Sequence, residues 1–271
     1  MKFKNIFSKH NKVLLLELVK TDFKLRYQGS VLGYLWSLLK PLMLFAIMYV
    51  VFIHFLRFGT GIPHFAVSLL LGIVMWTFFV EATSQGMQSV VARGDLLRKI
   101  KFSKYILVVS ATISALINLI LNLVIVFVFM LYDGVDFSWS ALLFPLSVTL
   151  LYLLALGLAF LLSAINVRFR DISHVWEVVL QGVFYATPII YPLQSVLNYN
   201  DLAGRLLMLN PIAVIFQNSR AQLVGSKNII TADQLFSNTF LIFTPYVLIL
   251  VTIIYSLWYF RKKQARFAEQ I

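Results

Sequence analysis

Residues 25–52, LRYQGSVLGYLWSLLKPLMLFAIMYVVF, begin as a charged segment and become almost continuously apolar after Gly33. Gly29 and Gly33 stand at the changeover, where a chain lying on a membrane must turn sharply to cross it. Trp36 is the kind of residue that anchors a helix at the level of the lipid headgroups. About 20 apolar residues cross the hydrocarbon of a bilayer. The stretch therefore predicts a membrane-spanning helix over about residues 34–56, with a sharply defined water boundary.

The whole chain has the composition of an integral membrane protein. Of its 271 residues, 60% are hydrophobic and 13% are charged, whereas about a quarter of the residues in a soluble domain are charged. The mean hydropathy is +0.85. Apolar runs predict an all-α membrane fold in one domain, residues 1–271, with six spans at about 34–56, 65–88, 105–131, 141–165, 175–191 and 239–260.

The fifth predicted span differs from the others. It is short, carries Glu177, and is interrupted by Pro188 and Pro192. Broken helices occur at membrane depth where they face protein or a water-filled cavity, so we expect this segment to line such a surface. Residues 192–237 then form an external region, with short helices that lie in the outer interface or re-enter the membrane, divided at Asn210-Pro211.

Positive charge is distributed unevenly along the chain. The net charge is +12, and 18 of the 23 Lys and Arg residues lie within residues 2–26, 93–104, 168–170 and 261–266. These segments alternate with the remaining loops along the predicted spans. The positive-inside rule therefore places them, and both termini, in the cytoplasm. This arrangement accounts for the basic charge without a nucleic-acid partner.

Residues 11–27 predict an amphipathic helix that lies on the cytoplasmic surface of the membrane. Lys20 and Lys24 share its polar side. Asp22 and Arg26 fall within the apolar arc, where their i,i+4 spacing allows them to pair. The alternative is a basic anchor that only holds the chain to anionic lipid.

Catalytic and metal-binding chemistry has no candidate residues in the sequence. Only Glu81 and Glu177 of the 11 acidic residues fall inside predicted spans, and the four histidines are scattered. The chain has no cysteine, and it lacks the G-x-x-x-x-G-K-[ST] motif that cradles nucleotide phosphates. We therefore expect no catalytic residue, metal or cofactor in this chain, and an energy source in a partner.

Four motifs carry a family resemblance: YQGSVLGYLWSLLKPL (27–42), NVRFRDI (166–172), YATPIIYP (185–192) and LNPI (209–212). In this order they resemble the ABC-2 type permeases that export cell-surface polysaccharides, teichoic acids and O-antigens. One position departs from the family pattern: Ser103 stands where the second cytoplasmic loop often has proline.

The resemblance implies a multi-pass protein of the bacterial cytoplasmic (inner) membrane. It implies a homodimer with two nucleotide-binding subunits, which bind ATP and Mg²⁺, and a lipid-linked glycan as the cargo. The basic helix and the boundary at Gly29, Gly33 and Trp36 then form the gate element on which the partner acts. The sequence leaves two alternatives open: export of a small hydrophobic drug or lipid, and an enzyme or scaffold acting on lipid-linked sugars.

Residues 94–104 are a candidate coupling helix for the ATPase partner. Asp95 is a suitable N-cap, and Leu96, Leu97 and Ile100 give one short apolar face. Arg98, Lys99 and Lys101 offer cations to an acidic groove. The alternative is that these cations only follow the positive-inside rule.

Aromatic residues are candidates for the substrate path. Phe45, Tyr49 and Phe52 recur at spacings that put them on one face of the first span, and Tyr185 and Tyr191 flank Pro188 in the fifth. An aromatic ring offers a sugar a sliding contact without a tight site. The alternative is that these rings pack between helices or face lipid.

The predicted topology can be tested by cysteine labelling, because no native cysteine interferes. A cysteine at Ser237 should react with an impermeant maleimide from outside intact membranes, since residues 192–237 are expected to be external. Labelling that appears only after permeabilisation would contradict this orientation.

Overall fold

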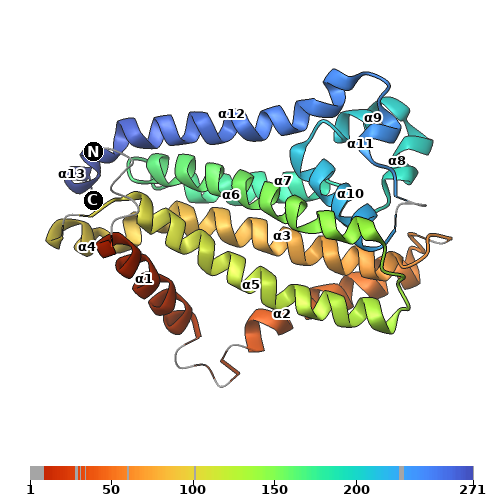
Figure 1. Ribbon diagram of the computed structural model, residues 1–271, viewed down its shortest axis with the longest axis horizontal. Helices are drawn as coiled ribbons and strands as arrows, with labels where there is room; N and C mark the ends of the chain where they lie inside the picture. Colours follow the sequence, from red (N-terminus) through yellow and green to blue (C-terminus); the bar gives the residue numbers. More distant parts are fainter. Residues whose placement is uncertain are drawn as a thin grey trace.

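A computed structural model describes residues 9–270 apart from 28, 29, 31, 34, 60, 101 and 226–228. The described chain is helical, and its long helices run side by side along one axis (Figure 1). These helices are α2 (Leu35–Met48, continued by the π-helix η2, Tyr49–Phe55), α3 (Phe65–Gln88), α5 (Tyr105–Tyr132), α6 (Phe144–Asn166, preceded by the 3-10 helix η4, Trp139–Leu143) and α12 (Thr239–Lys263).

Five helical segments are long and apolar enough to cross a membrane. They are Leu35–Phe55, Phe65–Gln88, Tyr105–Tyr132, Trp139–Asn166 and Thr239–Arg266. They coincide within a few residues with five of the six predicted spans, and the all-α membrane fold is confirmed. The agreement arises because each run is uniformly apolar over the length that hydrocarbon requires.

The fifth predicted span corresponds to the shorter helix α7 (Ile172–Tyr185), followed by a non-helical segment at 186–192. At 1.5 Å per residue, α7 is about 21 Å long, less than the about 30 Å of bilayer hydrocarbon. Helix and unwound segment together carry the chain from one end of the bundle to the other (Figure 1). Six crossings of a membrane stay a prediction.

Helix α3 is the centre of the bundle. In its most apolar window 78% of the residues are buried, against 11% in the α2–η2 segment and 17% in α12. Helices α5 and α6 pack along it. Small residues permit this approach: a Cβ added at Gly86 would lie 2.4 Å from the Cβ of Ala159 on α6. Close contact of this kind is how membrane helices associate, because lipid is as apolar as their side chains.

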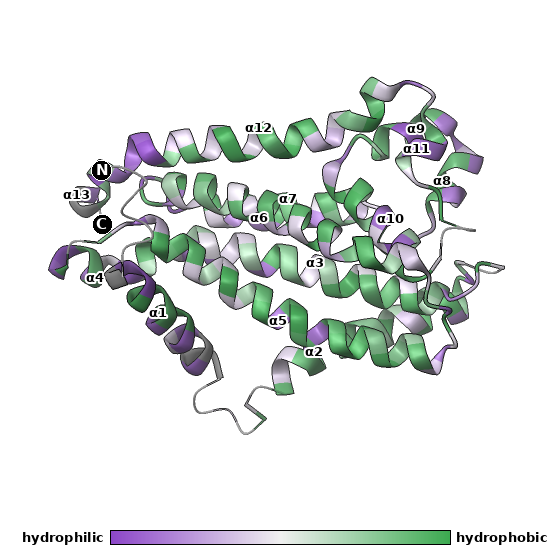
Figure 2. Cartoon of the chain, viewed as in Figure 1, coloured by the Kyte–Doolittle hydropathy of each residue, from purple (hydrophilic) through white to green (hydrophobic). Residues whose placement is uncertain are grey.

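Short elements gather at the two ends of the bundle. At one end lie α1 (Lys9–Tyr27), η3 (Val91–Arg93), α4 (Gly94–Lys99), η6 (Gln264–Arg266) and α13 (Phe267–Gln270). At the opposite end lie α8 (Leu193–Tyr199), α9 (Asp201–Leu207), α10 (Pro211–Leu223) and α11 (Ala232–Leu235). Figure 2 shows hydrophilic residues concentrated at both ends, with hydrophobic residues between them. The first is named the α4 end. The second is named the outer end, after the side of the membrane on which the sequence predicts residues 192–237 to lie.

The outer end contains more helices than the sequence predicts. The division at Asn210-Pro211 is correct: the Asn210 side chain caps α10 by accepting from the Ile212 amide at 3.0 Å, and proline occupies the first helical position. Helix α10 packs against α3, α6 and α12. It is therefore packed against three long helices of the bundle, and whether it re-enters the membrane stays a prediction.

Alanine substitutions at two glycines separate helix packing from helix propensity. Gly86→Ala should lower the thermal unfolding temperature of the purified protein by a few degrees, because overpacking a close helix contact costs about 1–3 kcal/mol. Gly182→Ala on α7 is the matched control, since a Cβ there meets nothing within 4 Å and alanine favours helix over glycine. An equal response of both variants would contradict the close packing of α3 against α6.

Candidate functional site

The α4 end holds helices α1 and α4 against three long helices as one packed unit. They enclose a hydrophobic cluster that includes Leu18 of α1, Leu97 of α4, Tyr105 of α5, Phe160 of α6 and Phe260 of α12. The rings of Tyr105, Phe160 and Phe260 have centroids between 4.9 and 5.7 Å apart. Movement of α1 or α4 relative to the bundle would break this apolar contact.

The candidate coupling helix is shorter than predicted. Helix α4 ends at Lys99, and Ile100 is extended rather than helical. Asp95 lies in the first turn and the N-cap position belongs to Arg93, so the predicted capping role of Asp95 is wrong. A carboxylate in the first turn still favours the helix dipole. Residues 102 and 103, which were predicted to be helical, are instead buried in a non-helical connection to α5.

The exposed side of α4 presents cations. Leu97 is buried and Leu96 half-buried, whereas Arg98 and Lys99 are exposed. Ile100 is also exposed, so the predicted apolar face reduces to the two leucines. The predicted cation Lys101 lies outside the described residues. The outward surface of α4 is therefore basic and suited to an acidic partner.

An ion pair joins α1 to the connection between α3 and α4. The Arg93 guanidinium donates to the carboxylate of Asp22, a contact that the sequence did not predict. The predicted pairing of Asp22 with Arg26 stays a prediction, because the side chain of Arg26 lies outside the described residues. The two side chains are only 19% and 23% exposed. Burial lowers the pKa of Arg93, yet a guanidinium remains charged at neutral pH.

Three other charged side chains of α1 face solvent. Lys20 donates to Glu17 at 3.1 Å in an exposed i,i+3 pair, and Lys24 is exposed. Exposed pairs contribute about 0–1 kcal/mol. Among the described charged side chains of α1, Asp22 is thus the one with an ion pair to another element.

The boundary between α1 and α2 contains a left-handed turn, and α2 begins unexpectedly far along α5 from the α4 end. Gly33 has φ +49°, a conformation that favours glycine, while Gly29 lies outside the described residues. Trp36 is 41% exposed. The Asn122 amide donates to the Ser37 carbonyl at 3.2 Å, which places the start of α2 about 25 Å along α5 from Tyr105. Figure 1 shows α2 beginning beside the middle of α5.

A polar network inside the bundle was not predicted from the sequence. The Glu81 carboxylate on α3 accepts from Asn118 of α5 at 2.9 Å and from Gln85 at 3.0 Å. The sequence feature that could have indicated this network is the presence of two asparagines, at 118 and 122, within a long apolar run, because side-chain amides form hydrogen bonds between membrane helices. No cluster of three or more His, Asp or Glu side chains that could hold a metal occurs in the described part of the chain.

The aromatic residues of the first span do not share one environment. Phe45 is buried, with its ring centroid 5.7 Å from that of Phe129 on α5. Tyr49 is 42% exposed, and Phe52 contacts Phe58 at 5.6 Å. The change to π-helix at Tyr49 rotates the following residues relative to a regular α-helix. Tyr49 is therefore the most accessible ring of the predicted path on this helix.

Helix α7 exposes a polar face. Glu177, Gln181 and Tyr185 follow one another at a spacing of four and are all exposed in the single chain. The Tyr191 hydroxyl donates to the Tyr185 carbonyl at 2.8 Å, which brings the two predicted path tyrosines together. A carboxylate on a membrane helix faces protein or water rather than lipid. This face therefore needs a second protein surface or an aqueous path opposite it.

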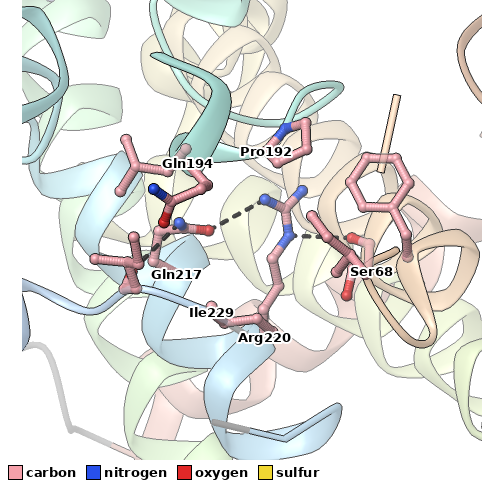
Figure 3. Close-up of a pocket in the computed structure, with 10 residues that line it drawn as sticks. Ser68, Pro192, Gln194, Gln217, Arg220 and Ile229 are labelled. Atoms are coloured by element: carbon pink, nitrogen blue, oxygen red, sulfur yellow. Dashed lines mark hydrogen bonds between the residues drawn. The ribbon is translucent and has the colours of Figure 1, made fainter. Parts of the chain in front are cut away.

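The non-helical segment after α7 contacts a buried arginine. Arg220 lies within residues 192–237, the predicted external region, and its residue is only 4% exposed. Its side chain extends from α10 toward α3 and the segment at 186–192 (Figure 3). This contact could not be predicted from residue spacing, because no periodicity relates Arg220 to residues about 30 positions earlier or to Ser68.

Comparison with known proteins identifies similar sequences over most of the chain. The model of the ABC-2 type transporter family matches residues 13–224. The O-antigen export system permease protein RfbA of Myxococcus xanthus is 33% identical over 210 residues, which cover 77% of this chain and 79% of that protein. The O-antigen export system permease protein RfbA of Klebsiella pneumoniae is 29% identical over 202 residues, covering 72% and 77%.

The ion pair of Asp22 and Arg93 predicts a charge-swap rescue. Leu18→Cys, a buried position on α1, should resist a water-soluble maleimide in the parent and become reactive with Asp22→Arg or Arg93→Asp. Each single change leaves a half-buried charge opposite a like charge. The double change Asp22→Arg/Arg93→Asp should restore protection, because the pair is reformed with reversed sign.

The exposed pair on the same helix supplies the control for this swap. Glu17→Lys/Lys20→Glu should leave the reactivity of Leu18→Cys unchanged, since that pair is solvated. Single variants that keep the cysteine protected would show that the cluster alone holds α1.

Proposed function

The chain belongs to the ABC-2 type transporter family, and we propose that it is the membrane-spanning subunit of an ATP-driven exporter of a lipid-linked cell-surface polysaccharide. The observation that carries this proposal is similarity to O-antigen export permeases over 72% to 77% of the chain. A bundle of apolar helices with structured elements at both ends suits transport across the membrane. The glycan would move from the cytoplasmic α4 end toward the outer end.

The energy for export would come from separate nucleotide-binding subunits, which bind ATP and Mg²⁺. The exposed cations Arg98 and Lys99 on α4 are the proposed contact with an acidic groove on such a subunit. A push on α4 would reach α1 through the pair of Arg93 and Asp22 and through the shared hydrophobic cluster. Helix α1 in turn leads to the boundary at Gly33 and Trp36, where the first span begins.

The exposed faces of the single chain support a homodimer that encloses the path. Glu177 and Gln181 on α7 are unsuited to lipid, and a second copy would cover them or enclose water beside them. Tyr49, Tyr185 and Tyr191 supply rings for sugar contact, with Phe45 and Phe52 behind them in the first span. In the described residues of one chain, no ring contact joins the two aromatic sets, so two copies would be needed to face them across a path.

Charge reversal on α4 tests both the coupling and the function. In cells that lack the native gene, the chain should restore surface display of the lipid-linked glycan. Arg98→Glu/Lys99→Glu should reduce that display at least about tenfold, because like charges facing each other across an interface cost several kcal/mol. Immunostaining of intact cells measures display, and extraction of the cell interior measures retained glycan.

Two consecutive basic residues at the end of α12 give the matched control for α4. Arg261→Glu/Lys262→Glu makes the same charge change at the end of α12, on the same predicted side, and should leave display within about twofold because surface substitutions away from a contact change little. Normal display in the Arg98/Lys99 variant would refute α4 as the coupling element. Failure of the unmodified chain to restore display would refute the proposed cargo.

A further inference from the structure

Arg220 is a buried cation whose hydrogen-bond partners are all carbonyl oxygens. Its Nε donates to the Ser68 carbonyl at 3.1 Å, Nη2 to Ile189 at 2.6 Å, and Nη1 to Pro188 at 2.5 Å and to the side-chain oxygen of Gln217 at 3.2 Å. It forms no ion pair within the described residues. Burial lowers the pKa of the guanidinium to about 10, so it stays charged at neutral pH. A buried charge without a carboxylate is costly unless its hydrogen bonds are complete.

Two of the acceptors of Arg220 are backbone carbonyls that follow the end of α7 and have no helical donors. Regular helix stops at Tyr185, and the next helix, α8, begins at Leu193. Between them the Pro188 and Ile189 carbonyls are buried and need a donor from elsewhere in the protein. The guanidinium provides charge-assisted hydrogen bonds to both. The non-helical segment and the buried arginine therefore stabilise each other.

Helix α3 is shaped to receive the guanidinium. Ser68 and Gly72 lie one turn apart on α3, and a Cβ added at Gly72 would come within 2.8 Å of Arg220 Nη2. The absence of a side chain at Gly72 thus leaves room for the charged group. At the N-terminal end of α10, the Asn210 side-chain amide donates to the Thr187 hydroxyl at 3.1 Å. Helix α10 therefore holds residues 187–189 from both of its ends.

Little free space remains around this contact. The adjoining cavity, lined by Ser68, Pro192, Gln194, Gln217 and Arg220 among others, has a volume of about 30 Å³ (Figure 3). That volume holds about one or two water molecules. The side chains of α3 and α10 therefore pack closely around the guanidinium.

We propose that Arg220 is a positioning residue that locks the non-helical segment 186–192 and α10 to α3, so that the outer end of the bundle stays closed until these hydrogen bonds are released together. Because three carbonyls from two separate parts of the backbone converge on one guanidinium, the segment cannot leave α3 gradually. The interpretation of this contact as a gate for the exported cargo rests on the proposed export function. The lock itself does not depend on the cargo.

A single cysteine in the non-helical segment reports on the lock. Thr187 is fully buried, so Thr187→Cys should react slowly with a water-soluble maleimide when the full chain is in lipid nanodiscs. Arg220→Lys keeps the charge but loses the planar fork that reaches several acceptors at once. It should raise the labelling rate at least about tenfold, the factor expected when a charge-assisted hydrogen bond is lost from a local opening equilibrium.

Two controls separate release of the lock from unfolding. Ser163→Cys on α6 is equally buried and distant from the outer end, and it should remain protected when Arg220→Lys is present. Arg205→Lys changes another arginine of the outer end that donates to a carboxylate and to the Leu235 carbonyl, and it should not alter labelling at Thr187→Cys. Protection of Thr187→Cys in both Arg220→Lys and Arg220→Met would overturn the proposal.

Gly72 provides a second test that leaves Arg220 in place. Gly72→Ala should raise the labelling of Thr187→Cys because the new Cβ displaces the guanidinium, and it should add little in the Arg220→Lys background. If the Arg220 variants fail to fold, this variant decides the question, and unchanged labelling would overturn the proposal. Since labelling requires no glycan, a failure of the lock is distinguishable from a failure of the proposed export function.

Discussion

Bilayer hydrocarbon offers no hydrogen-bond partner to a backbone amide or carbonyl, and the arrangement of this chain follows from that constraint. Five segments meet it as uninterrupted helices. The same need applies to buried hydroxyl groups. Those of Thr83, Ser110 and Ser163 donate hydrogen bonds to backbone carbonyls of their own helices. The segment after α7 is not helical, and there the protein must supply donors from another helix. Arg220 is the residue that does so.

The two ends of the bundle use positive charge in opposite ways. At the α4 end, Arg98 and Lys99 are exposed to solvent and can meet a partner, whereas Arg93 forms a half-buried ion pair. At the outer end, Arg220 is buried and donates hydrogen bonds to backbone carbonyls. Exposed charge favours association and exchange with other molecules, whereas a buried, fully bonded charge favours one fixed arrangement. The fold thus places an adaptable surface at one end and a fixed contact at the other.

Hydropathy and charge were sufficient to predict the helical fold and five of the long helices, because both signals are local in the sequence. The weak fifth span was also anticipated from Glu177 and the two prolines. The local errors concern α4, which is shorter than predicted and is not capped by Asp95. Contacts between distant residues were not predicted. Asp22 pairs with Arg93, which the packing of α1 on α5 brings close. The burial of Arg220 was not predicted either, because nothing in its local sequence reveals that α10 packs beside α3.

Helix α3 connects the two ends directly. It is the most deeply buried of the long helices, it continues through η3 into α4 at one end, and at the other it seats Arg220 beside Ser68 and Gly72. Its 24 residues correspond to a rigid rod of about 36 Å. In the proposed mechanism, a displacement of α4 by the partner subunit therefore moves the seat of Arg220 without any relay of loosely coupled side chains. A small shift along or about α3 would change all the hydrogen bonds of one guanidinium at once, and this turns a continuous push into a two-state release at the outer end.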